Sequence, residues 1–129
     1  HKDAKNPLDA LAAFGGLEVA TLTGAVMQAA SERRVIVVDG FIASSAVLIA
    51  SRIRSAVLDY CIFSHRSDEK GHSIMLDAMN AEPLLDLKLR LGEGSGAALA
   101  WPLLMSACTI LREMASFEAA GVSRDDESK

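Results

Sequence analysis

The chain has 129 residues, half of them apolar, and a formal net charge of −4 at pH 7. This length fits one domain of ordinary size, and the acidic balance argues against a protein that binds a nucleic-acid backbone or an anionic membrane surface, since either needs a clustered basic patch. Such an apolar composition in a short chain predicts apolar surfaces that a partner subunit or another part of the polypeptide covers.

The amino-terminal quarter of the chain is predicted to be helical. Residues 1–7 form a polar lead-in that ends in Pro7, and the chain does not open with the apolar segment of a signal peptide. Residues 8–14 are expected to form a short helix that two glycines close. Residues 17–32 carry apolar side chains at near-helical spacing on most sides, which is typical of a buried or interface helix.

A strand, a turn and a helix are expected next. Residues 35–38 are a β-branched run without alternation, which is typical of a strand buried on both faces of a parallel sheet. Asp39 and Gly40 end this strand, and residues 41–54 follow as a helix. Asp39 and Gly40 either form a simple turn, which local chemistry favours, or present a carboxylate and backbone N–H groups to a ribose or phosphate.

The rest of the chain continues the alternation of strands and helices. We expect a strand at residues 59–64, a polar loop at 65–72, a helix at 73–79, a short strand or extended segment at 83–87 and a helix at 97–118. This order predicts an α/β layered domain with a parallel sheet. Because ligands bind outside the carboxyl ends of parallel strands, three candidate loops are expected to share one edge of the sheet.

The polar loop begins with groups suited to binding an anion. Residues 64–67 supply two hydroxyls, an imidazole and a guanidinium at a predicted strand end. The alternative is an exposed loop that is polar only because it is a loop. His65 and His72 lie seven residues apart, but no known metal-binding spacing surrounds them, so we predict no metal site.

A single carboxylate, Glu93, lies among glycines in the segment at residues 89–96. The glycines remove side-chain bulk, so a small ligand can come close to it. Ser95 is expected to be the N-cap of the last helix, and the helix dipole would favour the carboxylate form of Glu93, which suits a general base. The alternative is a solvated Glu93 in a turn before a capped helix.

The carboxyl-terminal part is expected to be covered. Residues 94–111 include no charged side chain and reach the length of a membrane span, but Pro102 and the hydroxyl residues favour a buried helix. Cys61 and Cys108 lie in apolar contexts without metal-binding spacing, so we predict buried free thiols in a reducing cytosol. The charged tail at residues 123–129 is predicted to be disordered.

Several short segments carry a resemblance through their order and spacing. They are NPLD and GGLE at residues 6–9 and 15–18, VDGFI at 38–42, SHRS at 64–67, EPLLDL at 82–87 and RLGEGSGAA at 90–98. Together they resemble the C-terminal part of the nicotinate-nucleotide:dimethylbenzimidazole phosphoribosyltransferase family, over residues 6 to 121.

The resemblance implies a Rossmann-like layered parallel sheet with flanking helices, as the C-terminal portion of a larger fold. Residues 8–122 would form this portion, with the terminal helix at 95–121 packing on a small helical domain or a dimer partner. The family implies a cytoplasmic homodimer in the nucleotide-loop branch of cobalamin synthesis. It also implies that no cofactor or metal is needed.

The implied reaction moves the phosphoribosyl group of nicotinate mononucleotide onto 5,6-dimethylbenzimidazole, giving α-ribazole 5′-phosphate and nicotinate. By resemblance, Glu93 is the catalytic general base that takes the benzimidazole N–H proton. The implied substrate-binding residues are Asp39, Gly40 and Ser67 at the phosphoribosyl part, and Leu91 and Gly92 at the aromatic base.

The chain departs from the family pattern in two ways. Asp68 and Lys70 replace a small residue and a proline, so the loop after Ser67 is expected to differ. The family's glycine-rich phosphate loop and a phosphate-contacting lysine belong to upstream sequence that this chain does not contain, so we expect no turnover by this chain alone. The alternatives are a non-catalytic ligand-binding or dimerisation module of the same fold, or another α/β glycosyl- or phosphoribosyl-transferring enzyme with a different base.

Overall fold

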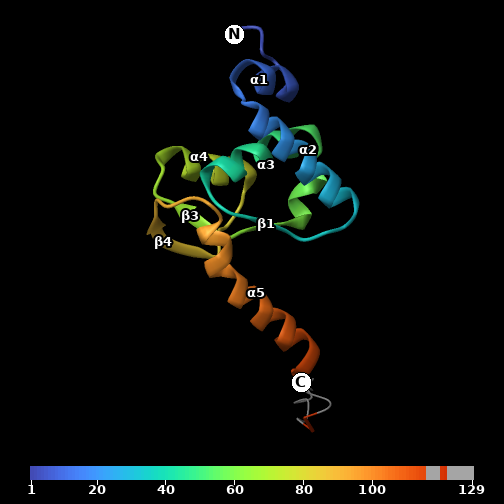
Figure 1. Ribbon diagram of the computed structural model, residues 1–129. Coiled ribbons are helices and arrows are strands. Elements are labelled where there is room, and N and C mark those ends of the chain that lie inside the picture. Colours follow the sequence, from blue (N-terminus) through green and yellow to red (C-terminus); the bar gives the residue numbers. More distant parts are fainter. Residues whose placement is uncertain (116–119, 122–129) are drawn as a thin grey trace, which may run out of the picture.

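The computed structural model describes residues 1–115 and 120–121. In chain order the elements are α1 (Pro7–Phe14), α2 (Leu17–Ser31), β1 (Ile36–Val38), α3 (Phe41–Ile53), the 3₁₀ helix η1 (Ser55–Tyr60), β2 (Cys61–Phe63), β3 (His65–Ser67), α4 (Lys70–Met79), β4 (Leu85–Leu89) and α5 (Ser95–Glu113) (Figure 1). This alternation of helices and strands confirms the predicted α/β fold.

The strands pair in parallel, as predicted. β1 pairs with β2, and β3 pairs with β4. Ser64 joins the two pairs, because its N–H donates to the carbonyl of Val38 at 2.9 Å and its carbonyl accepts from the N–H of Leu85 at 3.1 Å. β2 and β3 therefore form one interrupted central strand between β1 and β4, and the carboxyl ends of these strands share an edge.

The predicted strand at residues 59–64 and loop at 65–72 are both wrong in part. Residues 59–60 belong to η1, and the first three residues of the expected loop form β3. The run from His65 to Ser67 has no β-branched or alternating apolar residue, so local propensity does not indicate a strand. Its extended conformation depends on backbone pairing with β4, a partner about 20 residues further along the chain.

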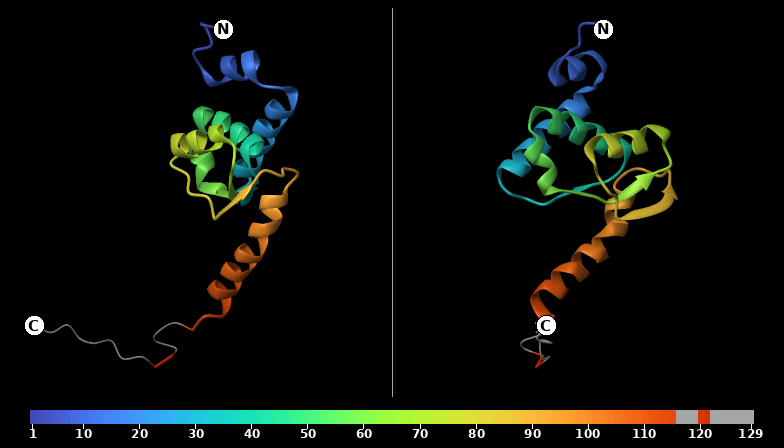
Figure 2. Two further views of the ribbon diagram at one scale, coloured as in Figure 1. Left: turned by 90° about the vertical axis from the view of Figure 1, so that its left-hand side faces the viewer. Right: turned by 180° about the vertical axis from the view of Figure 1, so that it is seen from behind.

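Helices cover the strands unequally. α2, α3 and α4 lie on one side of the strands, and α5 leaves from the other side (Figures 1 and 2). Among the described elements α5 contacts β3 and β4, and its buried residues are Gly96 and Ala100 near its amino terminus. The prediction of a buried helix is therefore wrong for the described chain, and α5 is also long and apolar enough to cross a membrane by length and composition alone.

The carboxyl-terminal expectations differ from the structure in detail. α5 ends at Glu113, short of residue 118 in the predicted helix at 97–118 and of residue 121 in the helix at 95–121 that the resemblance implies, and Met114 is extended. The described residues from Trp101 to residue 115 are exposed or only partly buried, and most of the stability of a helix comes from tertiary packing. Cys108 is exposed and Cys61 only partly buried, so the prediction of two buried thiols is wrong. The predicted disordered tail at 123–129 lies outside the described residues.

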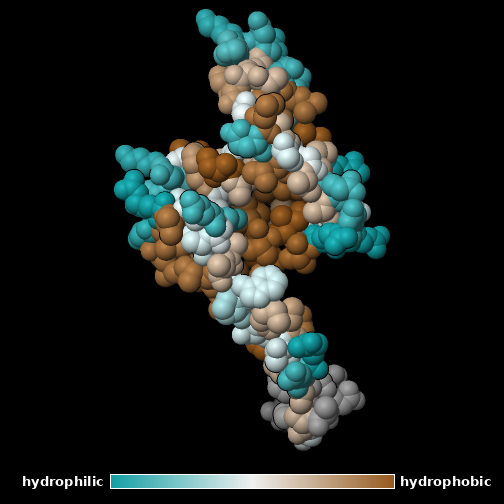
Figure 3. Space-filling view, viewed as in Figure 1, coloured by the Kyte–Doolittle hydropathy of each residue, from teal (hydrophilic) through white to brown (hydrophobic). Residues whose placement is uncertain are grey.

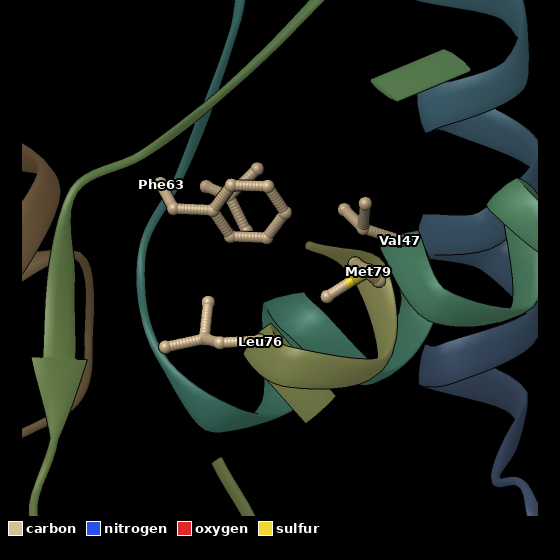
Figure 4. Close-up of a cluster of buried hydrophobic side chains, with 5 residues drawn as sticks. Val47, Phe63, Leu76 and Met79 are labelled. Atoms are coloured by element: carbon tan, nitrogen blue, oxygen red, sulfur yellow. The ribbon is translucent and has the colours of Figure 1, made fainter. Parts of the chain in front are cut away.

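The main apolar core lies between the strands and the helices on one side of them. Val47 from α3, Phe63 from β2, and Leu76 and Met79 from α4 point toward one another (Figure 4), and Val38 from β1 completes the cluster. Leu76 is completely buried. Because this cluster joins β1, β2, α3 and α4, it fixes these elements relative to one another. It thereby positions the loops that follow β1 and β3.

We expect Leu76→Ala to lower the free energy of unfolding by about 2–5 kcal/mol, because it leaves a cavity in this cluster. The matched control is Ile74→Ala on the same helix, since Ile74 is 69% exposed and should change the value by less than about 0.5 kcal/mol. Urea unfolding followed by circular dichroism measures both. Equal effects of the two substitutions would contradict the position of the core.

Candidate active site

A pocket of about 450 Å³ opens at the carboxyl ends of β1, β3 and β4. Every site residue predicted from the sequence lines it, namely Asp39, Gly40, Ser67, Leu91, Gly92 and Glu93. The prediction that three loops share one edge of the sheet is confirmed. The pocket combines apolar and polar walls, as sites for small organic ligands do.

The carboxylate of Asp39 caps the amino terminus of α5. Its Oδ1 accepts from the N–H of Ala97 at 2.9 Å, and its Oδ2 accepts from the N–H of Gly94 at 3.3 Å. The N-cap residue is Gly94, which has no side chain to do this. The prediction of Ser95 as the N-cap is wrong, because Ser95 is the first helical residue and its hydroxyl donates to the carbonyl of Leu91.

Glu93 immediately precedes this capped end and is exposed at the pocket. Its φ is +63°, in the left-handed region that non-glycine residues rarely adopt, and Gly94 follows with φ +81°. Such backbone strain persists where the surrounding structure determines it, often at functional sites. The hydrogen bond from Gly94 to Asp39 supplies that constraint and keeps the Glu93 carboxylate beside the pocket.

Successive side chains of β3 point to opposite faces of the sheet, so the strand separates polar residues that are neighbours in the sequence. His65 and Ser67 line the pocket, whereas Arg66 points away. The Arg66 guanidinium donates to the hydroxyl of Ser73 at 3.0 Å and lies 3.7 Å from the carboxylate of Asp86. The predicted anion-binding set at residues 64–67 is therefore not brought together in one place.

A buried histidine holds the end of β3. Nδ1 of His72 accepts from the backbone N–H of Ser67 at 2.9 Å, and its Nε2 lies 2.9 Å from the hydroxyl of Ser44. Because Nδ1 is an acceptor, the neutral ring carries its proton on Nε2 and donates it to Ser44. His72 thus joins α4 to α3 and fixes the backbone of Ser67 at the pocket wall.

The sequence analysis did not assign several residues of the pocket wall to the site, among them Phe41, Glu69 and Arg90. His65 belonged to the predicted anion set, but only a strand with a period of two indicates that it shares a face with Ser67. Phe41 had an available signal, its position next to Gly40. Among the described residues, no group of three or more His, Cys, Asp and Glu is arranged to hold a metal ion.

Comparison with known proteins identifies the family. Residues 1–122 match the family model described as Phosphoribosyltransferase. The chain belongs to this family. The similar nicotinate-nucleotide–dimethylbenzimidazole phosphoribosyltransferase of Variovorax paradoxus (strain S110) is 68% identical over 126 residues, which are 98% of this chain and 36% of the relative. Its counterpart from Ralstonia nicotianae is 59% identical over 123 residues, which are 95% of this chain and 35% of that relative.

Solved structures agree with this assignment. A crystal structure of nicotinate-nucleotide-dimethylbenzimidazole phosphoribosyltransferase from Thermus thermophilus matches with a TM-score of 0.86 and 41% identity, over 95% of this chain and 37% of that one. The resemblance inferred from the sequence is confirmed. The chain spans about a third of the length of the curated relatives it matches.

We expect Asp39→Ala to lower the free energy of unfolding of this chain by about 0.5–2 kcal/mol, the usual cost of losing a helix cap. The amide protons of Gly94 and Ala97 should also exchange faster with solvent, because they lose their acceptor. Asp59→Ala, at an exposed carboxylate in η1, is the control. Unchanged exchange at both amides would contradict the capping role.

His72 is expected to make stability depend on pH. Burial lowers the pKa of His72 below its ordinary value of 6.5, neighbouring His65 and Arg66 lower the pKa further, and Asp39 partly opposes them. The folded state therefore binds its proton less readily than the unfolded state, so stability falls as pH drops below about 6.5.

Urea unfolding between pH 8 and 5 tests this dependence. His72→Gln should be less stable at pH 8 but should lose less stability on acidification than the unsubstituted chain. A His1→Gln variant is the control, because His1 is exposed and lies outside the core. Parallel stability curves for His72→Gln and the unsubstituted chain would refute the coupling.

Proposed function

We propose that this chain serves the transfer of the phosphoribosyl group from nicotinate mononucleotide to 5,6-dimethylbenzimidazole, giving α-ribazole 5′-phosphate and nicotinate. The observation that carries the proposal is the pocket. Every residue that the resemblance assigns to the substrates is part of its lining. The names of the relatives support the same reaction. This transfer belongs to the nucleotide-loop branch of cobalamin synthesis.

In the proposed mechanism, Glu93 is the general base. The lone pair of one azole nitrogen forms the new bond to C1′ of the ribosyl group, while the bond from C1′ to the nicotinate nitrogen breaks and its electrons return to the ring. Nicotinate leaves from a pyridinium and needs no acid, whereas the azole must lose its N–H proton, which Glu93 accepts. Attack opposite the leaving group inverts C1′ from β to α.

The other pocket residues receive roles from their positions. We assign the hydroxyl of Ser67 and the backbone at Gly40 to the phosphoribosyl group, and Leu91 and Gly92 to the aromatic base. Leu91 is 69% exposed and a Cβ added to Gly92 would meet no described atom, so a flat ring has room there. For Asp39 the ligand contact stays a prediction, beside its observed contacts with α5.

We further propose that α5 packs on another part of the full polypeptide or on a second copy in a homodimer. Its exposed side chains include Trp101, 56% exposed, and Leu111, 86% exposed. The face in Figure 3 also carries a hydrophobic hollow above the start of α5. Exposed apolar surfaces of this kind mark interaction sites. The cytoplasmic location and the absence of nucleic-acid or membrane partners stay predictions.

A second candidate is a non-catalytic ligand-binding or dimerisation module of the same fold. The exposed apolar side of α5 favours it, since an interaction module needs such a surface. The chain's share of its relatives, about a third, is compatible with either function. Binding of nicotinate mononucleotide without release of nicotinate would favour the module over the transferase.

We expect Glu93→Gln to reduce azole-dependent release of nicotinate by about 10²- to 10⁴-fold, because the amide cannot accept the proton. The measurement uses the longest polypeptide that contains this chain, with nicotinate mononucleotide in the presence and absence of dimethylbenzimidazole. Glu82→Gln is the matched control, since Glu82 is exposed and lines a separate pocket.

The outcomes separate the role of the residue from the reaction. Full activity of Glu93→Gln would place the base elsewhere. No azole-dependent release by the unsubstituted polypeptide would remove the transferase function and leave the binding module.

A further inference from the structure

The ring of His65 is held in the pocket wall by two glycines. His65 is 2% exposed. A Cβ added to Gly96 at the start of α5 would overlap the ring, and one added to Gly40 would lie 3.0 Å from its Cε1. Either position therefore needs glycine, or a shift of the ring, so the imidazole is fixed between the loop after β1 and the amino terminus of α5.

Hydrogen bonds determine which nitrogen of His65 carries the proton. The hydroxyl of Ser64 donates its only proton to the carbonyl of Asp39 at 2.8 Å. The same oxygen lies 3.3 Å from Nδ1 of His65, and toward that nitrogen it can act only as an acceptor. In the neutral ring the proton is therefore on Nδ1, and Nε2 has a free lone pair.

No group among the described residues donates a hydrogen bond to this lone pair. Every fully buried polar side-chain atom among these residues has a hydrogen-bond partner, so an atom without a partner, such as Nε2, is not fully buried. Nε2 must therefore reach solvent, and His65 lines the pocket that also holds Ser67 and Glu93. A fixed, nearly buried acceptor at the wall of a ligand pocket is a specificity group, since burying it unpaired would cost free energy.

We propose that Nε2 of His65 accepts a hydrogen bond from a hydroxyl of the substrate's ribosyl group. This inference rests on the proposed function, which places a ribosyl group between Ser67 and Glu93. A lone-pair acceptor selects a donor, and ribose hydroxyls are donors, whereas phosphate and carboxylate groups are acceptors when ionised. His65 thereby discriminates ribosyl from deoxyribosyl substrates.

The test pairs substitutions of His65 with removal of single substrate hydroxyls. His65→Asn keeps a polar group near the position of Nδ1 and removes Nε2, whereas His65→Gln places an amide near the position of Nε2. Calorimetry measures the dissociation constants of nicotinate mononucleotide and its 2′-deoxy and 3′-deoxy analogues, at pH 8, with the longest polypeptide that contains this chain. Circular dichroism and urea unfolding of each variant confirm that it folds.

Removal of the contacted hydroxyl should weaken binding to the unsubstituted protein by about tenfold, the size of one good neutral hydrogen bond. His65→Asn should bind that deoxy analogue and the parent nucleotide with equal affinity, and His65→Gln should restore part of the difference. If both His65 variants discriminate as the unsubstituted protein does, or if none of the three binds the nucleotide, the proposal is overturned.

Binding and turnover together separate this proposal from the proposed function. Discrimination that depends on His65 without azole-dependent nicotinate release would keep the ribosyl contact and remove the transferase. Transfer with discrimination that does not depend on His65 would keep the transferase and remove the contact. If His65→Asn instead weakens binding of inorganic phosphate or of dimethylbenzimidazole by the same factor as the nucleotide, the ligand group is not a ribosyl hydroxyl.

Discussion

The contact between the Asp39 carboxylate and the amino terminus of α5 is the interaction on which the candidate site depends. It joins the end of β1 to residues 55 and 58 positions further along the chain. Helix termini leave backbone N–H groups unpaired, and a carboxylate satisfies them while also complementing the helix dipole. Because Glu93 directly precedes Gly94, the same contact determines where the candidate base lies relative to β1.

Two histidines give the short strand β3 a fixed position that its few backbone hydrogen bonds could not supply alone. His72 accepts from the backbone of Ser67 and contacts Ser44 on α3, while the ring of His65 fills the space that Gly40 and Gly96 leave open. Buried polar groups of this kind specify one arrangement when each has its partner. Here both histidines are buried, and His65 lines the pocket.

The apolar surface of α5 is largely uncovered by the rest of the described chain. Most of the stability of a helix in a protein comes from tertiary packing of its apolar face, and burial of apolar surface contributes about 25 cal/mol per Å². The proposed packing of α5 on another part of the full polypeptide or on a second copy would bury these side chains.

The amino-acid sequence by itself determined the alternation of helices and strands apart from η1 and β3, the parallel pairing of the strands, and six of the residues that meet at the edge of the sheet. Helices such as α2 and α3, and the glycine-rich segment around Glu93, depend on near neighbours, so their patterns can be read locally. Only the tertiary structure decided that residues 65–67 form a strand, that Arg66 points away from the pocket and that His65 lies within its wall. Each of these depends on backbone pairing or on a side chain from a distant segment, and local propensity carries no information about such partners.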